Sequence, residues 1–96
     1  IPLCHPLVFD AVDVRLARRR SRRQVEVLAT IRGSGRTGYE MEAMVAAAAA
    51  ALTVYDMCKA AEKGIVVGPI ELVEKSGGKS GDWRRAPARS GSRRRA

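Results

Sequence analysis

The sequence predicts an α+β fold in which a long helix lies across an antiparallel sheet. Two runs of alternating apolar and polar residues, 8–16 and 24–32, are joined by an arginine-rich stretch, which is typical of an antiparallel hairpin. An alanine-rich stretch, 35–64, follows the hairpin and precedes a further apolar run at 70–75, expected to be a third strand. With 96 residues, the chain has room for one domain with a modest core.

The hairpin prediction rests on parity, because alternate side chains of a strand point to opposite faces. One face of the first strand carries Val8, Val12, Val14 and Leu16, with Asp10 as its polar exception. The matching face of the second strand carries Val25, Val27, Ala29 and Ile31. Both faces are expected to be half-buried, whereas the connection at 17–23 (ARRRSRR) is expected to be solvated.

The stretch 35–64 is expected to form one helix, because alanine is the best helix former and residues 46–51 are all alanine. Thr37, with Glu40 three residues later, fits a capping box at the start of this helix. Small side chains allow another backbone to approach closely, so we expect the helix to lie at an oligomer interface.

The net charge of +8 is unevenly distributed. Six arginines lie between Arg15 and Arg23 and six more between Arg84 and Arg95, and without these twelve the remaining net charge is −4. Aromatic side chains, on which bases could stack, are few. Nucleic-acid binding is therefore not expected as the main function, although a basic nucleic-acid-binding protein stays open as an alternative.

The two cysteines, Cys4 and Cys58, are far apart and show neither a CxxC motif nor the spacing of a zinc site. This usage favours a reduced intracellular protein, cytoplasmic or, in a eukaryote, mitochondrial. No uninterrupted apolar stretch reaches the roughly 18 residues of a membrane span, so no membrane partner is expected.

The helix carries polar groups that could do chemistry. Asp56 and Lys59 are three residues apart, within contact range on one helical face. They form either an ordinary surface ion pair or, if partly buried, a general acid and base. Glu42 lies fourteen residues before Asp56, about 21 Å along the axis, so these acids would serve the two ends of an elongated ligand or different sites completed by neighbouring subunits.

Two loops add candidates. His5, the only histidine, lies between Cys4 and Pro6 and could orient a ligand or simply be structural. Lys75 opens a glycine-rich stretch that could hold phosphate through backbone N–H groups and lysines, although a charged hairpin turn explains it nearly as well. This stretch is not a P-loop, because Val73 stands where the first glycine should be and no helix follows.

Four sequence motifs match those of a known family, in the same order along the chain: IPLCHPL at 1–7, GRTGYEMEA at 35–43, ALTVYDMCKA at 51–60 and GPIELVEKSGGKSGDW at 68–83. They resemble the cyclic pyranopterin monophosphate synthase family of molybdenum cofactor biosynthesis, MoaC. The resemblance implies a ferredoxin-like α+β fold and a hexamer built as a trimer of dimers, with active sites at dimer interfaces. It also implies a lyase that converts 3′,8-cyclo-7,8-dihydro-GTP to cyclic pyranopterin monophosphate and releases diphosphate.

By the same resemblance, Asp56 and Lys59 are the catalytic pair. The resemblance also implies a set of substrate contacts, namely Leu3, Cys4, His5, Glu40, Met41, Glu42 and Lys75. No metal site and no resident cofactor are expected, although a magnesium ion could accompany the substrate triphosphate. The expected partners are the GTP-derived substrate and further copies of this chain.

The sequence also departs from the family. Members have a further N-terminal portion with another catalytic lysine, so a truncated chain, inactive alone, is one expectation. Tyr39 stands where a small aliphatic residue is usual, and the arginine-rich end is not a family feature. We therefore expect a MoaC-like domain over 1–83 and a disordered tail over 84–96. A non-catalytic oligomerisation module of the same fold stays open as an alternative.

Overall fold

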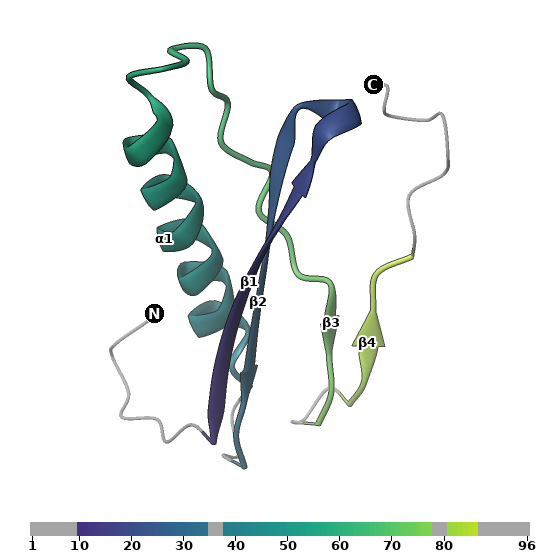
Figure 1. Ribbon diagram of the computed structural model, residues 1–96. Coiled ribbons are helices and arrows are strands. Elements are labelled where there is room, and N and C mark those ends of the chain that lie inside the picture. The colour runs from purple at the N-terminus through teal and green to yellow at the C-terminus, as the bar shows by residue number, and fades with distance from the viewer. Residues whose placement is uncertain (1–9, 35–37, 78–80, 87–96) are drawn as a thin grey trace.

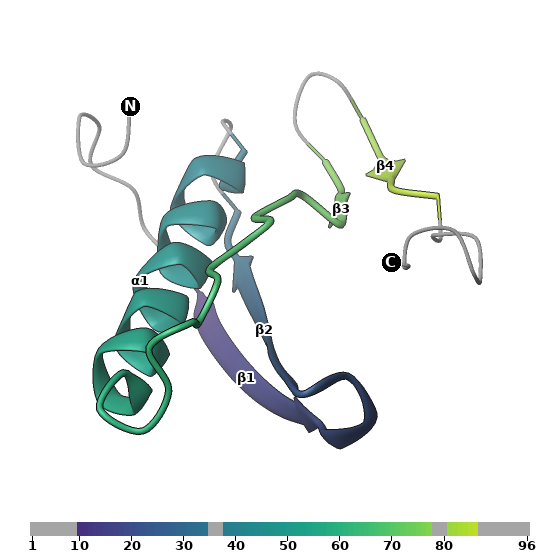
Figure 2. The same ribbon diagram turned by 90° about the horizontal axis from the view of Figure 1, so that it is seen from above.

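The computed structural model describes residues 10–34, 38–77 and 81–86, and it confirms the α+β class. In chain order the elements are β1 (Ala11–Arg19), the 3₁₀ helix η1 (Arg20–Arg22), β2 (Gln24–Arg32), α1 (Glu40–Cys58), β3 (Glu74–Lys75) and β4 (Trp83–Arg84). β1 and β2 form one antiparallel sheet beside α1, and β3 and β4 form a second (Figure 1). The second sheet projects away from the unit made by α1, β1 and β2 (Figure 2). A helix on an antiparallel sheet is consistent with the ferredoxin-like fold.

The first hairpin confirms the predicted parity. Its pairing runs from Ala11 opposite Arg32 to Arg19 opposite Gln24. β2 has the predicted bounds, but β1 continues three residues past the predicted end to Arg19. It does so because Arg18 and Arg19 still pair with β2, and Arg19 Nη2 donates to Glu26 Oε1 at 3.0 Å. The connection is shorter than predicted, and residues 8 and 9 lie outside the described part of the chain.

The helix covers the apolar face of β2 and leaves that of β1 open. The β2 residues Val27, Ala29 and Ile31 are half-buried. Their cross-strand partners on the same face, Leu16, Val14 and Val12, are 58%, 44% and 54% exposed. None of the described residues is fully buried, so one helix and one hairpin do not close a core by themselves.

The helix is shorter than the predicted stretch 35–64. It begins at Glu40, and its last turn closes with the Lys59 N–H donating to the Tyr55 carbonyl at 2.9 Å. A turn follows, in which the Gly64 N–H donates to the Glu62 carboxylate at 2.9 Å and the chain reverses. The capping-box interpretation of Glu40 is wrong, because Glu40 is the first helical residue and its carboxylate binds Lys75. Thr37 lies outside the described residues.

By length and composition alone, α1 could cross a membrane. It has 19 residues and a mean hydropathy of 1.3, and none of the tested window is buried. It is not an uninterrupted apolar stretch, because it carries Glu40, Glu42 and Asp56. The core helix of a soluble protein can have the same length and composition.

The predicted third strand is largely wrong. Residues 65–73 return along α1 and β2 without strand pairing, and only Glu74–Lys75 forms a strand, which pairs with Trp83–Arg84 rather than with the hairpin. Pro69 has no N–H to donate to a ladder, and Gly68 has a φ of 118°, outside the strand region. These two residues interrupt the apolar stretch that begins at Ile65, and the segment after them forms a strand only at Glu74–Lys75.

The short second sheet is held by residues 83–85. Arg84 Nη2 lies 2.6 Å from Glu74 Oε1, and the Arg85 N–H donates to the Val73 carbonyl at 2.7 Å. The Arg85 guanidinium also donates to the Leu72 carbonyl at 2.8 Å and lies 5.4 Å from the centre of the Trp83 ring. These contacts fasten the two ends of the glycine-rich loop together.

One ion pair joins the start of α1 to the second sheet. Lys75 Nζ lies 2.8 Å from Glu40 Oε2, and with side chains 20% and 33% exposed this is the most covered ion pair of the described residues. The hydrogen bond from Lys75, followed by one from the backbone N–H of Glu40 itself, holds the pKa of the Glu40 carboxyl below its ordinary value. The pair therefore fixes the position of Lys75 relative to the helix.

We expect Gly33→Ala to lower the free energy of unfolding by about 1–3 kcal/mol, because an added Cβ would overlap the Tyr39 ring. Urea unfolding followed by circular dichroism measures this change. The matched control is Gly64→Ala, whose Cβ would meet only the end of the flexible Glu62 side chain. Equal changes in the two variants would contradict a close contact between Gly33 and Tyr39.

We expect the free energy of unfolding to fall more steeply with acid in the parent chain than in the Glu40→Gln variant. Since the folded-state pKa of Glu40 is lowered from 4.5, the stabilisation is present above pH 4.5 and is lost as pH falls through the folded-state pKa. Urea unfolding between about pH 3 and about pH 6 measures this difference in slope.

The control for this experiment is Glu42→Gln, which removes the same charge from the same helical turn. Glu42 forms no ion pair with any described residue, so its variant should keep the acid dependence of the parent. Parallel curves for the parent and Glu40→Gln would show that the pair with Lys75 does not stabilise the fold.

Candidate active site

The described candidate residues lie in two clusters at the two ends of α1. Glu40, Met41 and Glu42 occupy its first turn, with Lys75 of β3 beside them. Asp56 and Lys59 occupy its last turn and C-cap. The remaining candidates, Leu3, Cys4 and His5, lie outside the described residues.

The cluster at the start of α1 combines two acids, a thioether and an amine. The carboxylates lie in the first helical turn, where the helix dipole favours negative charge. Met41 is 45% exposed and Glu42 is half-buried, so both are accessible to a ligand. The Lys75 ammonium uses one of its three N–H donors on Glu40 and keeps two for another acceptor. This cluster can hold an anion on Lys75 while Glu40 orients the amine.

The cluster at the end of α1 is an ion pair in direct contact. Lys59 Nζ lies 2.9 Å from Asp56 Oδ1, which confirms that the two side chains share one helical face. Their side chains are 54% and 72% exposed, and neighbouring Met57 is 77% exposed. Partial burial, which would let the pair exchange a proton with a ligand, is therefore not supplied by this chain alone. An exposed pair of this kind contributes at most about 1 kcal/mol to stability.

The two clusters cannot act on the same atoms within one chain. Glu40 and Asp56 are sixteen residues apart on one continuous helix, which is about 24 Å along the axis. The separation of Glu42 and Asp56 along the same helix follows the prediction. A single compact ligand could therefore reach only one end of α1 within one chain.

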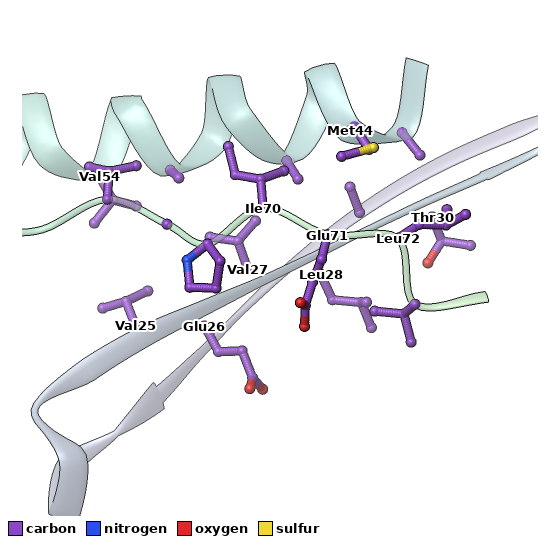
Figure 3. A pocket seen from close by; sticks show the side chains of 18 of the residues that line it. Val25, Glu26, Val27, Leu28, Thr30, Met44, Val54, Ile70, Glu71 and Leu72 are labelled. Atoms are coloured by element: carbon purple, nitrogen blue, oxygen red, sulfur yellow. The ribbon is translucent and has the colours of Figure 1, made fainter. Parts of the chain in front are cut away.

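An open groove runs along α1, and its lining includes Glu40 and Lys75 but neither Asp56 nor Lys59. Figure 3 shows Val27 of β2 and Ile70 of the returning segment on the side of the sheet that faces α1, with Val54 of the helix above them. Glu26 and Leu28 point to the other side of the sheet (Figure 3). The groove is mostly apolar, so it suits packing more than recognition of a charged ligand.

The contact between Glu40 and Lys75 is the feature that sequence reasoning missed. Each residue was a candidate by itself, but they are thirty-five positions apart and no local spacing connects them. The glycine at position 38 offered one signal. A Cβ there would contact the carboxylate of Glu40 and come within 3.2 Å of Lys75 Cε, so the close approach of this pair depends on the absence of a side chain.

Within the parts of the chain that the structure describes, no three His, Cys, Asp or Glu side chains converge as metal ligands. The acids of α1 are instead spread along its length or engaged by lysines. A magnesium ion carried by a triphosphate would have its phosphate oxygens as ligands and would not need such a cluster.

Comparison with known families agrees with the motifs. The model of the MoaC family matches residues 1–78. The match includes both clusters of α1, Lys75 and the three candidates at the N-terminal end of the chain. It ends before β4 and the arginine-rich end. Because the match covers most of the chain, this protein belongs to the MoaC family.

Proposed function

We propose that this protein acts in molybdenum cofactor biosynthesis as a cyclic pyranopterin monophosphate synthase. The role in that pathway follows from family membership, and the reaction is the finer step that we infer. The substrate would be 3′,8-cyclo-7,8-dihydro-GTP, with diphosphate as the leaving product. The observation that carries the proposal is the contact between Asp56 and Lys59, at 2.9 Å within the matched region.

Asp56 and Lys59 would act as the acid–base pair. Opening and reclosing a guanine-derived ring requires a proton to be taken from one atom and delivered to another nearby. A carboxylate and an ammonium in contact can do both, provided that water is excluded around them. Since this pair is exposed in one chain, the proposal requires a further element to cover it.

Lys75 would hold the triphosphate, and Glu40 would keep its amine in place. An ammonium is a compact point charge that suits phosphate oxygens, and its two remaining donors are available for them. Met41 and Glu42 would contact the same ligand from the first turn of α1. Leu3, Cys4 and His5 stay proposed substrate contacts from the resemblance alone.

We propose that further copies of this chain supply the missing cover, in a hexamer built as a trimer of dimers. The apolar row Val12, Val14 and Leu16 on β1 is about half exposed, and Val66 is 87% exposed. A second subunit would bury these side chains and bring one end of its α1 to the opposite end of the first. The two clusters at the ends of α1 would then form one site.

The remaining parts of the proposal concern other ligands. No resident cofactor is needed for proton transfer and diphosphate release, and magnesium would enter only with the triphosphate. We propose a cytoplasmic protein without a membrane partner, and its main function does not involve nucleic acid.

A non-catalytic oligomerisation module is the second candidate, because the exposed pair of Asp56 and Lys59 and the open apolar row suit assembly without chemistry.

We expect Asp56→Asn to lower the rate of diphosphate release from 3′,8-cyclo-7,8-dihydro-GTP by about 100-fold or more, because general acid–base groups contribute at least this much. A coupled phosphate assay measures the rate. The control is Asp13→Asn, which also removes an exposed carboxylate paired with a nearby cation, here Arg15 at 2.7 Å, and should leave the rate unchanged.

Two outcomes would contradict the reaction. One is equal rates for Asp56→Asn and the parent chain. The other is a parent chain that binds the substrate in calorimetry and releases no diphosphate, which would favour the non-catalytic module.

We expect Leu16→Asp to shift the protein from an oligomer to smaller species, because a carboxylate would replace a 58% exposed leucine in the proposed interface. Size-exclusion chromatography with light scattering measures the mass. Gln24→Asp, on the opposite face of the same sheet, is the control and should keep the parent mass. A monomeric parent chain, or an unchanged mass for Leu16→Asp, would contradict this interface.

A further inference from the structure

The tip of the first hairpin carries a cluster of arginines that are not among the candidate site residues. Of the six arginines between Arg15 and Arg23, two are paired: Arg15 with Asp13 at 2.7 Å and Arg19 with Glu26 at 3.0 Å. The other four form no ion pair with any described residue and are exposed; they are Arg18, Arg20, Arg22 and Arg23. We call these four residues the arginine turn.

The backbone holds the arginine turn in a defined shape. Arg20–Arg22 form η1, and the Arg23 N–H donates to the Arg20 carbonyl at 3.0 Å. Arg23 has a φ of 52° and a ψ of 50°, the left-handed conformation that reverses the chain into β2. Arg20, Arg22 and Arg23 therefore lie in one tight turn, and Arg18 lies in β1 just before it, so four exposed arginines fall within six consecutive residues of the hairpin tip.

The arginine turn is distant from Lys75. It lies at the end of β2 opposite Arg32, after which the chain leads to the start of α1 (Figure 1). The eight steps from Gln24 to Arg32 are about 27 Å of extended strand. The arginine turn and the pair of Lys75 with Glu40 therefore lie toward opposite ends of β2, so a compact ligand held by the pair does not reach the turn.

The chemistry of the turn selects phosphate. The chain has 14 arginines against 4 lysines, and no lysine lies within the turn. Guanidinium forks bind phosphate oxygens in pairs, which an ammonium cannot do. Residues 18–24 contain no aromatic or aliphatic side chain that could insert into a bilayer or stack on a base. The turn is thus suited to a rigid array of phosphates and to no particular base sequence.

We propose that the arginine turn is a sequence-independent contact for the phosphate backbone of a nucleic acid. The contact is additional to the main function of the protein, whose remaining charge and few aromatic residues still argue against a dedicated nucleic-acid-binding protein. It consists of contacts between guanidinium groups and phosphates, without base contacts, so its affinity falls steeply with salt. It does not depend on the proposed reaction or on the substrate.

The test is fluorescence anisotropy of a labelled 20-base-pair DNA duplex with the full chain at several salt concentrations. We expect a dissociation constant of about 10⁻⁴–10⁻⁶ M at physiological salt for the parent chain. Replacing all four arginines of the turn with glutamine should weaken binding at least about 10-fold. The slope of log affinity against log salt concentration should flatten by about 3 to 4, because each phosphate that the variant no longer neutralises removes roughly 0.9. Lysine at the same four positions should restore most of the slope.

The matched control removes the same charge elsewhere, by replacing Arg89, Arg93, Arg94 and Arg95 with glutamine. The proposal predicts that this variant keeps most of the slope. It is overturned if the control loses as much affinity as the turn variant, or if the parent chain does not bind the duplex. It is also overturned if polyglutamate at equal charge competes as well as DNA, or if vesicles containing phosphatidylserine bind the chain more tightly than the duplex does.

Discussion

The packing of α1 against β2 is the interaction on which the rest of this structure depends. It sets which face of the hairpin is covered, and it places the first helical turn beside Lys75 and the last turn in the open. Because a single helix covers one strand well and its neighbour poorly, the row of Val12, Val14 and Leu16 stays exposed. The chain therefore keeps an exposed apolar row on β1, and its two clusters of candidate residues lie at the two ends of the same helix.

Local periodicity predicted the fold where neighbours in sequence decide the conformation. β2 has the predicted bounds, and the apolar face of the hairpin is correct, because strand parity depends only on alternation. The run at 70–75 lacks this regular alternation, because Val73 has the opposite parity to Ile70 and Leu72, and it forms only two residues of strand after the interruption at Gly68 and Pro69. The capping box failed for a related reason, because a distant lysine competes for Glu40 more effectively than the helix start does.

The candidate site likewise has one contact that local sequence predicted and one that it did not. Helical spacing was enough to predict contact between Asp56 and Lys59, since both residues lie at one end of a helix. It could not predict their exposure, which depends on what packs around the helix rather than on the helix itself. The pair of Glu40 and Lys75 required the tertiary structure, because its two members come from different elements. The catalytic roles proposed for Asp56 and Lys59 rest on the resemblance to the family and not on spacing.

The second sheet places a tryptophan, whose fluorescence can be measured, beside Lys75. Trp83 is the only tryptophan of the chain, and it is the cross-strand partner of Lys75 in the pairing of β3 with β4. Its ring is 44% exposed and lies beside the Arg85 guanidinium. Indole emission responds to nearby charge and to water, so an anion bound at Lys75 would change the surroundings of the fluorophore. Trp83 would thus report on the proposed binding at Lys75, its partner across the two ends of the glycine-rich loop, without an added label.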